Sequence, residues 1–448
     1  MKLWEKGTSI NELIEKFTVG NDREMDLYLA ESDVLGTIAH CIMLEKVGLL
    51  TADELHILRK ELSAVYRQIE EGRFLIEADI EDVHSQVEYM LTQKLGDTGK
   101  KVHSGRSRND QVLVDLRLFT RDNLIHISQS VKVLFDVLQS QSEKYKHALL
   151  PGYTHLQLAM PSSFGLWFGA YAEALSDDLL LLQSAYLLNN QNPLGSAAGF
   201  GSSFPLDRRL TTQLLGFDDL NYNVVNAQIG RGKIERITAF ALANLAATLS
   251  RMASDLCLYM SQNFNFITLP DELTTGSSIM PHKKNPDVFE LIRARCNRIQ
   301  NVPAEITLLM NNLTSGYFRD MQIIKESFLP LFDELQAILE VTTLMINSVQ
   351  INENILDDPK YNYLFSVESV NDAVLQGVPF RDAYKMVSAQ IAAGLFTPEK
   401  EIHHTHEGSI GNLCNEDIAR KFNTVFDSFP VNKVAEVKKS LVDYLPLD

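Results

Sequence analysis

One short loop concentrates residue types that could remove a proton and hold an anion. Residues 276–286 read Gly-Ser-Ser-Ile-Met-Pro-His-Lys-Lys-Asn-Pro. Asn285 followed by Pro286 predicts the start of a helix, because Asn caps free backbone amides and Pro tolerates the first helical position. The free amides of a helix start, with an ammonium group beside them, favour a bound carboxylate. A solvated surface loop before a helix explains the same residues and stays open as the alternative.

Three other loops are unusually polar. Residues 102–111 contain two arginines whose planar guanidinium groups could grip carboxylates. Residues 151–157 contain His155, and residues 314–322 add another guanidinium group. Taken singly, each loop also fits solvated charges at a helix end, and a lone histidine is more often structural than catalytic. The glycine-rich run 195–201 follows a predicted helix rather than a strand, which argues against a dinucleotide-binding fold.

Long helices must position these loops. No glycine or proline occurs between Gly105 and Pro151, and apolar residues recur there at alternating spacings of three and four. This segment could form a rod on the order of 60 Å long. Similar stretches lie within 170–192, 232–270 and 331–358. The apolar seams comprise Leu124, Ile127, Val131, Leu134 and Leu138 in the first stretch, and Leu242, Leu245, Leu249, Met252, Leu256 and Tyr259 in the 232–270 stretch.

Such stripes must be buried against one another, which predicts an all-α helical bundle. We expect three domains: an N-terminal helical domain over 1–105, a central bundle over 106–355 and a small helical domain over 356–448. Rods of this length expose more apolar surface than one chain can cover. We therefore expect other copies of the chain to complete the bundle.

Composition excludes several classes of protein. The net charge of −17 and the pI near 5.1 argue against a nucleic-acid partner. The four cysteines are far apart, so we expect them to be reduced and buried rather than to form disulfides or a zinc site. The start Met1–Lys6 lacks the apolar core of a signal peptide, and no uninterrupted apolar run reaches membrane-spanning length. A cytoplasmic protein without a membrane partner is expected.

Several motifs together resemble a known family. Gly-Ser-Ser-Ile-Met-Pro-x-Lys-x-Asn-Pro at 276–286, with Thr-His-Leu-Gln at 154–157, resembles the fumarase and aspartase superfamily of lyases. Within it, His-Ser-Gly-Arg-Ser-Arg-Asn-Asp-Gln at 103–111 and Pro-Gly-Tyr-Thr-His-Leu-Gln at 151–157 most resemble the argininosuccinate lyases. The similarity runs from residue 20 to the Pro-Phe-Arg at 379–381. Several long motifs in the right order are specific, whereas any one alone is not.

The resemblance implies a three-domain, all-α lyase that reversibly splits argininosuccinate into L-arginine and fumarate. It implies no cofactor and no metal, and a homotetramer whose active sites collect loops from three subunits. The same match implies Ser277 as the base, Lys283 as a carboxylate ligand, and His155, paired with Glu290, as an aid to proton transfer. The substrate-binding positions that it implies are Ser107, Arg108, Asn109, Thr154, Asn285, Tyr317, Arg319 and Gln322, with Asp26 and His84 near the site.

Elimination chemistry suits these residue types. Removing a proton next to a carboxylate builds up a doubly negative aci-carboxylate, which needs cations and amides where the charge develops. A serine is a weak base in water, so Ser277 requires a closed, dry site that stabilises its alkoxide. The segment 276–280 suits a lid. The sequence leaves open whether the leaving nitrogen receives a proton or departs already protonated.

The chain also departs from the family pattern. His282 stands in place of a usual glutamine, Arg319 in place of a usual lysine and Ser104 in place of a usual threonine, and Asp22 lies where some members have a serine that contacts the amino-acid end. His282 leaves an adenylosuccinate-lyase-like enzyme as the nearest alternative, which Arg106 and Arg108 disfavour. The alternative of another class is a catalytically silent structural relative, as some lens delta-crystallins are. The complete set of matched acid–base residues argues against it.

Overall fold

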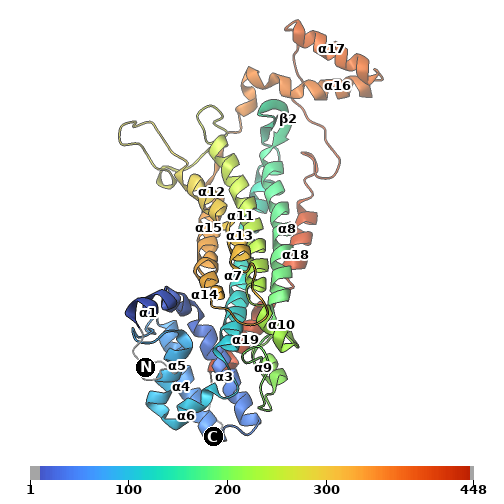
Figure 1. Ribbon diagram of the computed structural model, residues 1–448. Helices are drawn as coiled ribbons and strands as arrows, with labels where there is room; N and C mark the ends of the chain where they lie inside the picture. Colours follow the sequence, from blue (N-terminus) through green and yellow to red (C-terminus); the bar gives the residue numbers. More distant parts are fainter. Residues whose placement is uncertain (1–10, 444–448) are drawn as a thin grey trace.

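The structure, a computed structural model, describes residues 11–443 (Figure 1). The segment Met1–Lys6, on which the expected absence of a signal peptide depends, lies outside the described residues. The chain is elongated. A bundle of long helices joins a group of shorter helices at one end to a helix pair at the other end. Figure 1 shows that α1 and α19 both lie towards the end with the shorter helices.

Four rods form the bundle, as predicted, and their bounds are α7 (Arg108–Lys144), α8 (Phe164–Asn189), α11 (Lys233–Tyr259) and α15 (Pro330–Ser348). The 37 residues of α7 correspond to a rod of about 55 Å. Helix α8 begins before the predicted start at residue 170, because the Ser163 hydroxyl caps it by accepting from Leu166 N–H. Helix α15 ends before residue 358, where the chain turns into strand β6 (Gln350–Ile351).

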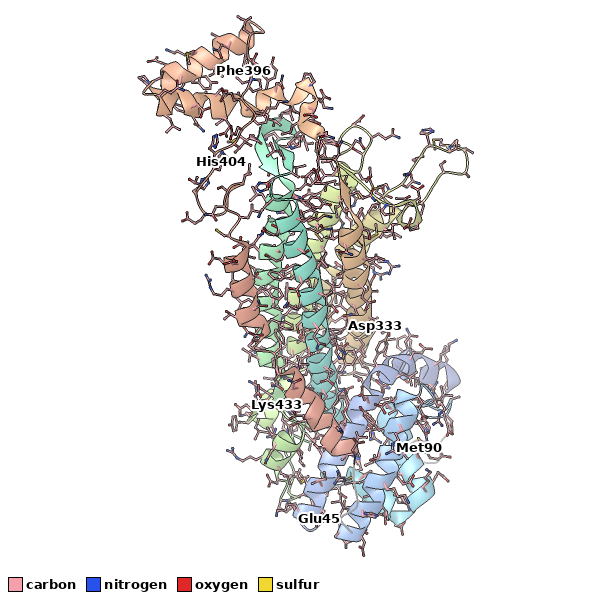
Figure 2. All side chains as sticks on the ribbon, turned by 180° about the vertical axis from the view of Figure 1, so that it is seen from behind. Glu45, Met90, Asp333, Phe396, His404 and Lys433 are labelled. Carbon is pink, nitrogen blue, oxygen red and sulfur yellow. The ribbon has the colours of Figure 1, made fainter. Side chains whose placement is uncertain are left out.

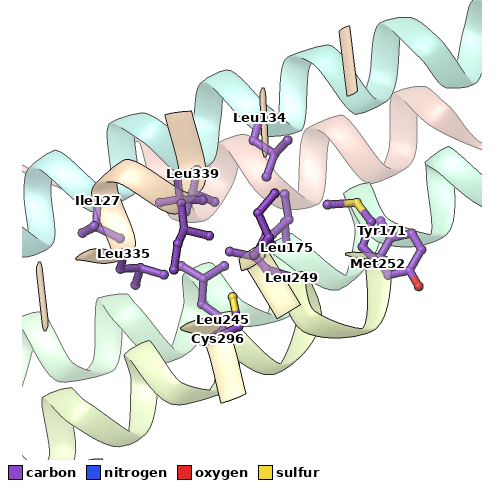
Figure 3. Packing of buried hydrophobic residues seen from close by; sticks show 14 of the residues in the cluster. Ile127, Leu134, Tyr171, Leu175, Leu245, Leu249, Met252, Cys296, Leu335 and Leu339 are labelled. Atoms are coloured by element: carbon purple, nitrogen blue, oxygen red, sulfur yellow. The ribbon is translucent and has the colours of Figure 1, made fainter. Parts of the chain in front are cut away.

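The predicted apolar seams form the core. Helix α7 packs against α8 and α15, and α11 packs against α8 and α12 (Asp287–Ile299). Leu134, Leu175, Leu249 and Leu339 point towards one another between these rods (Figure 3). The seam residues of α7 and α11 are all buried except Tyr259, which is half-buried. The apolar stripes are therefore buried in the core, as their spacing predicted.

Shorter helices build the N-terminal end, and their bounds are α1 (Glu12–Val19), α2 (Asp22–Asp26), η1 (Leu27–Leu29), α3 (Ala30–Lys46), α4 (Ala52–Glu70), α5 (Val83–Leu95), α6 (Asp97–Lys100) and η2 (Lys101–His103). Helix α4 begins with a capping box between Thr51 and Glu54. A second apolar core joins α3, α4 and α5 to the first half of α7 through Val114 and Leu118. This core fixes the start of α7 against the N-terminal helices.

Connecting segments complete the bundle and contain little strand. The helices among them are α9 (Arg208–Leu214), α10 (Val224–Ile229), η3 (Asp271–Leu273), α13 (Val302–Leu309) and α14 (Asp320–Phe328). The antiparallel pair β1 (Leu149–Thr154) and β2 (Gln157–Ser163) is the longest, and β3 (Gln191–Asn192) with β4 (Asp219–Leu220) and β5 (Ile267–Thr268) with β6 are two-residue pairs. Scarce strand was predicted, but residues 151–157 were expected to be a loop and instead form part of a hairpin.

The C-terminal region is spread along the whole molecule. Its elements are η4 (Ile355–Asp357), η5 (Pro359–Phe365), α16 (Ser366–Leu375), α17 (Phe380–Ala392), α18 (Asn415–Phe426) and α19 (Val431–Val442). Helices α16 and α17 pack on each other at the far end, near the Phe396 and His404 labels in Figure 2. Helix α18 lies along α8, and α19 returns to α3. The division into three domains stays a prediction.

Two composition-based expectations need comment. The helical stretch Leu13–Lys46 has the length and composition to cross a membrane, but 78% of its apolar window is buried inside the protein, as in the core helix of a globular protein. All four cysteines are free, as expected. Cys41 and Cys296 are buried, whereas Cys257 and Cys414 are only partly buried, so the expectation of burial holds for half of them.

Candidate active site

A cavity of about 320 Å³ lies where the N-terminal helices meet the ends of the rods. Seven of the predicted substrate-binding residues line it, namely Asp26, His84, Arg108, Asn109, Tyr317, Arg319 and Gln322. They come from α2, α5, the first turn of α7, the segment that leads into α14, and the first turn of α14. Residues nearly 300 positions apart in the sequence thus share one cavity.

The start of α7 is built to present Arg108 and Asn109. The Ser107 hydroxyl caps the helix by accepting from Asn109 N–H, and Asp110 Oδ1 accepts from Ser107 N–H. The second oxygen of buried Asp110 accepts from Gly195 N–H and Ala197 N–H, so the glycine-rich run wraps this helix start. Ser107 caps the helix beside the cavity but does not line it.

The two arginines of this loop have different surroundings. Arg108 lines the cavity and donates to Gln111 Oε1 at 2.8 Å and to Glu88 Oε2 at 2.9 Å. Arg106 instead donates to Thr37 Oγ1 and to the Val102 carbonyl, and it is not among the cavity-lining residues. We expected both arginines to bind a substrate carboxylate. For Arg106 this expectation is wrong, because its guanidinium group is hydrogen-bonded to other residues of the chain.

The structure adds Lys325 and Arg231 to the cavity, neither of which was predicted. The Lys325 ammonium group, 5% exposed, donates to Asp26 Oδ1 at 2.6 Å and also pairs with Asp22. The Arg231 guanidinium lies 5.7 Å from the centre of the Tyr317 ring. The sequence held a weak signal for Lys325, because it lies four residues after Met321 and three before Phe328, on the helix face that these two apolar residues must bury. A charge on such a face needs a partner.

The cavity's ionisable groups are strongly perturbed. Burial and the neighbouring Asp26 carboxylate raise the pKa of Asp22 from 3.8 to about 6, although the Lys325 charge opposes this. Burial and the charges on Arg108 and Arg106 together lower the pKa of His103 from 6.5 to about 4. His103 is therefore neutral at pH 7. The lining as a whole carries both signs of charge, which suits a ligand that also carries both.

The Ser277 loop is closed at its base and open at its tip. A β-bridge joins Thr275 to Asn285, and Asn285 N–H donates to the Thr275 carbonyl at 2.9 Å. The Ser277 hydroxyl oxygen accepts from Ile279 N–H at 3.4 Å and from Met280 N–H at 3.2 Å. These amides stabilise negative charge on that oxygen, as an alkoxide base requires.

One expectation for this loop needs correction. The helix start lies at Asp287, and the Asn285 side chain does not cap it, because its amide donates to Thr275 Oγ1 and the Gly276 carbonyl instead. Lys283 and Glu290 are exposed, and Ser277 and Asn285 are half-buried.

His155 lies at the tip of the β1–β2 hairpin. Thr154 pairs with Gln157, so His155 and Leu156 form a two-residue turn, and both have positive φ (54° and 57°). Such turns favour Asn-Gly, and side chains with positive φ at this position are strained. Thr154 and His155 are exposed. The His155 side chain is thus exposed at the tip of a strained turn.

The predicted residues fall into a cavity group at one end of the rods and two further groups, the hairpin and the Ser277 loop, beyond the other end. Arg108 begins α7 at the cavity, whereas the hairpin with His155 follows the other end of that rod, about 55 Å away. Arg231 lines the cavity just before α11, whereas the Ser277 loop lies beyond the other end of α11 (Figure 1). The cavity therefore lacks the expected base, histidine and lysine from its own chain.

Comparisons with known proteins identify the family of this chain. The family model described as "Lyase" matches residues 6–301. The argininosuccinate lyase of Parabacteroides distasonis is 63% identical over 441 residues, which cover 98% of this chain and 99% of the relative. The chain belongs to the argininosuccinate lyase family.

Solved structures show the same fold. A crystal structure of EDDS lyase in complex with formate has a TM-score of 0.77 at 21% identity and covers 97% of this chain and 95% of its own. The class II fumarase of Schistosoma mansoni has a TM-score of 0.72 at 17% identity, over 93% and 95% of the two chains. This member of the argininosuccinate lyase family is thus a carbon–nitrogen lyase with the mostly helical, fumarase-class fold.

Proposed function

We propose that this chain reversibly cleaves argininosuccinate into L-arginine and fumarate at sites assembled from three copies of a homotetramer. One copy supplies the cavity, a second supplies the hairpin with Thr154 and His155, and a third supplies the Ser277 loop. The observation that carries this proposal is the separation of the cavity from both the hairpin and the Ser277 loop along rods of about 40 to 55 Å. An antiparallel neighbour can bring the far end of its rods to this cavity.

Exposed apolar side chains on the rods support self-association. Large apolar residues that would be costly to leave in water lie exposed on α8, α11 and α12, including Leu180, Leu181, Leu187, Leu188, Phe240, Leu258 and Leu291. They do not belong to the internal seams. Further copies of the chain would bury them, as the length of the rods predicts.

The proposed step follows from the residue chemistry. Ser277 Oγ takes a proton from the carbon next to a succinyl carboxylate, and the two backbone amides that bind its oxygen favour the required alkoxide. Lys283 and Asn285 bind that carboxylate and stabilise the charge that develops on it. The carbon–nitrogen bond then breaks, its electron pair moves to the guanidino nitrogen, and fumarate is left. His155, paired with Glu290, assists proton transfer.

The cavity would receive the arginine end of the substrate. Lys325 and Arg231 provide positive charge for a carboxylate, and the acidic wall around Asp22 and Asp26 provides acceptors for ammonium or guanidinium groups. Tyr317, Gln322 and Asn109 add neutral hydrogen-bonding groups. We include Lys325 in the proposed site because it is a buried cation that lines the cavity. Such an enzyme would act in arginine biosynthesis in the cytoplasm.

A fumarate-release assay tests the proposed reaction. The purified protein should form fumarate from argininosuccinate but not from adenylosuccinate, and its mass in solution should equal four chains. Fumarate from adenylosuccinate alone would overturn the substrate assignment. No fumarate from either compound, by a folded tetramer, would favour the catalytically silent relative. A stable monomer with full activity would overturn the shared site.

A further inference from the structure

Behind the cavity wall, three buried ionisable residues from three helices meet. His84 on α5 lines the cavity, Asp33 lies on α3 and Asp115 lies on α7. His84 Nδ1 lies 2.7 Å from Asp33 Oδ1 and 3.4 Å from Asp115 Oδ2. The side chains are 4%, 2% and 1% exposed. In the described part of the chain they form the one group of this kind with metal-ligand spacing.

Three oxygens of this group lack hydrogen-bond donors. Asp33 Oδ2 and both oxygens of Asp115 are buried without a partner in the described structure. Burying an ionised carboxylate in this way is unfavourable in free energy, because its oxygens lose their hydrogen bonds to water and gain none from the protein. Either a bound proton or a bound cation must therefore compensate the negative charge of Asp33 and Asp115.

The nearby cationic side chains already pair with other groups. The Lys325 ammonium pairs with Asp22 and Asp26, and Arg106 donates to Thr37 and Val102. The nitrogen Nδ1 has at most one proton, which the 2.7 Å bond directs to Asp33. Among the described residues, no lysine or arginine forms an ion pair with Asp115, whose contact with a nitrogen is the one to His84 Nδ1 at 3.4 Å. Burial raises the pKa of Asp115 well above the usual range, and the charges on Asp33 and Asp26 raise it further, against the opposing charges of Arg106 and Lys325.

We propose that Asp115 is protonated at neutral pH and that Asp115 and Asp33 form a buried pair of carboxyl groups that positions His84. The pair holds the imidazole proton on Nδ1, inside the protein. Since Nδ1 is turned away from the cavity, Nε2 is the ring nitrogen presented to it. A neutral imidazole with its proton on Nδ1 has an acceptor at Nε2.

This arrangement gives His84 a definite binding role. An acceptor at Nε2 suits an N–H donor of the substrate, such as a guanidino or ammonium group, and rejects a carboxylate oxygen. Asp33 and Asp115 do not reach the cavity and are positioning residues. The binding role of His84 rests on the proposed function. The protonation of Asp115 does not.

A bound divalent cation is the competing explanation. Two carboxylates and an imidazole are suitable ligands for such an ion. In that case both aspartates would be ionised and Nδ1 would have no proton. The two explanations therefore differ in the number of protons, which can be measured.

Infrared difference spectroscopy of the tetramer at pH 8 measures the proton directly. A protonated carboxylic acid has a carbonyl band that a carboxylate lacks. The wild type should show this band, and Asp115→Asn should lose it. The matched control Asp178→Asn removes another buried aspartate, whose burial raises its pKa to about 6, so Asp178 is ionised at pH 8 and its variant should leave the band unchanged. No acid band in the wild type would overturn the proposal even if Asp115→Asn does not fold.

Kinetics and metal analysis complete the test. The amide introduced by Asp115→Asn is still a neutral hydrogen-bonding group, so this variant should lower kcat/KM by less than Asp33→Asn does. Asp33→Asn should lower kcat/KM on the order of 10- to 100-fold, as for the loss of an orienting partner, and should shift the pH profile. One divalent ion per chain in the purified enzyme, lost in Asp115→Asn, would overturn the proposal. If the wild type shows the acid band but releases no fumarate, the proposed function fails and the protonation of Asp115 stands.

Discussion

At the scale of single residues, the chain contains a strained turn and a cluster of buried charged groups at its proposed site. His155 and Leu156 have positive φ at a turn where Asn-Gly is preferred, and Asp22, Asp26 and Lys325 crowd three charges into a buried corner. Such features cost stability, and proteins tolerate them where function requires them. The residue-scale predictions concern the base and this charged corner.

Replacing Ser277 with alanine should remove the base. We expect kcat to fall by about 10²- to 10⁴-fold, the usual contribution of a positioned acid or base, with a much smaller change in KM. The matched control is Ser278→Ala, which alters the next hydroxyl in the same loop. Fumarate absorbance measures both. Equal loss of activity in the two variants would show that the loop, and not the Ser277 hydroxyl, is what matters.

Asp22 should make the folded state less stable as the pH rises. Its pKa is 3.8 when unfolded and about 6 when folded, so between these values the folded state binds more protons than the unfolded state. Its contribution to stability is therefore present below pH 4 and is lost by about pH 6, at a cost of about 3 kcal/mol. Asp22→Asn should raise the Tm at pH 7 and flatten the change in Tm between pH 4 and pH 6. An unchanged pH dependence would be inconsistent with this account.

At the scale of elements, the helices follow from the sequence far better than the turns do. The rods were predicted because Gly and Pro are absent from them and their apolar residues recur every three or four positions. The β1–β2 hairpin was missed because Pro151 and Gly152 resemble loop residues, and only the paired register shows their strand. The ion pairs of Lys325 and the Asp33–His84–Asp115 group could not be predicted from the sequence, because each joins helices that lie far apart in it.

The hairpin should depend on Gly152. A Cβ atom at this position would lie 2.6 Å from the Met160 carbonyl oxygen in the opposite strand, closer than real contacts allow. Gly152→Ala should therefore displace the turn that presents His155, and lower both the Tm and kcat. Gly72→Ala is the control for kcat: Gly72 follows α4, does not line the cavity and has a φ of +67°, so this variant should lower the Tm but leave kcat unchanged. A Gly152→Ala enzyme with wild-type kcat would mean that the hairpin need not be held in this register.

At the scale of the whole molecule, the length of the rods decides where chemistry can occur. One chain carries the cavity at one end and the Ser277 loop and His155 hairpin beyond the other ends of α11 and α7. The sequence motifs identified the residues, but the distance between them is visible only in the fold. A catalytic site then requires neighbouring copies, and activity should be lost when the tetramer dissociates.

Mixing two inactive variants tests this central claim most directly. Ser277→Ala and His155→Asn tetramers are each expected to be nearly inactive. After subunit exchange, hybrid tetramers should contain some sites with both residues intact, so that activity returns to at most about a quarter of the wild-type value. The matched control mixes Ser277→Ala with Lys283→Ala. Because one loop contains both residues, every loop in those hybrids remains defective and no activity should return. Recovery in the first mixture alone is the predicted result. Hybrid tetramers that form, as native mass spectrometry can verify, yet stay inactive in the first mixture would contradict the account.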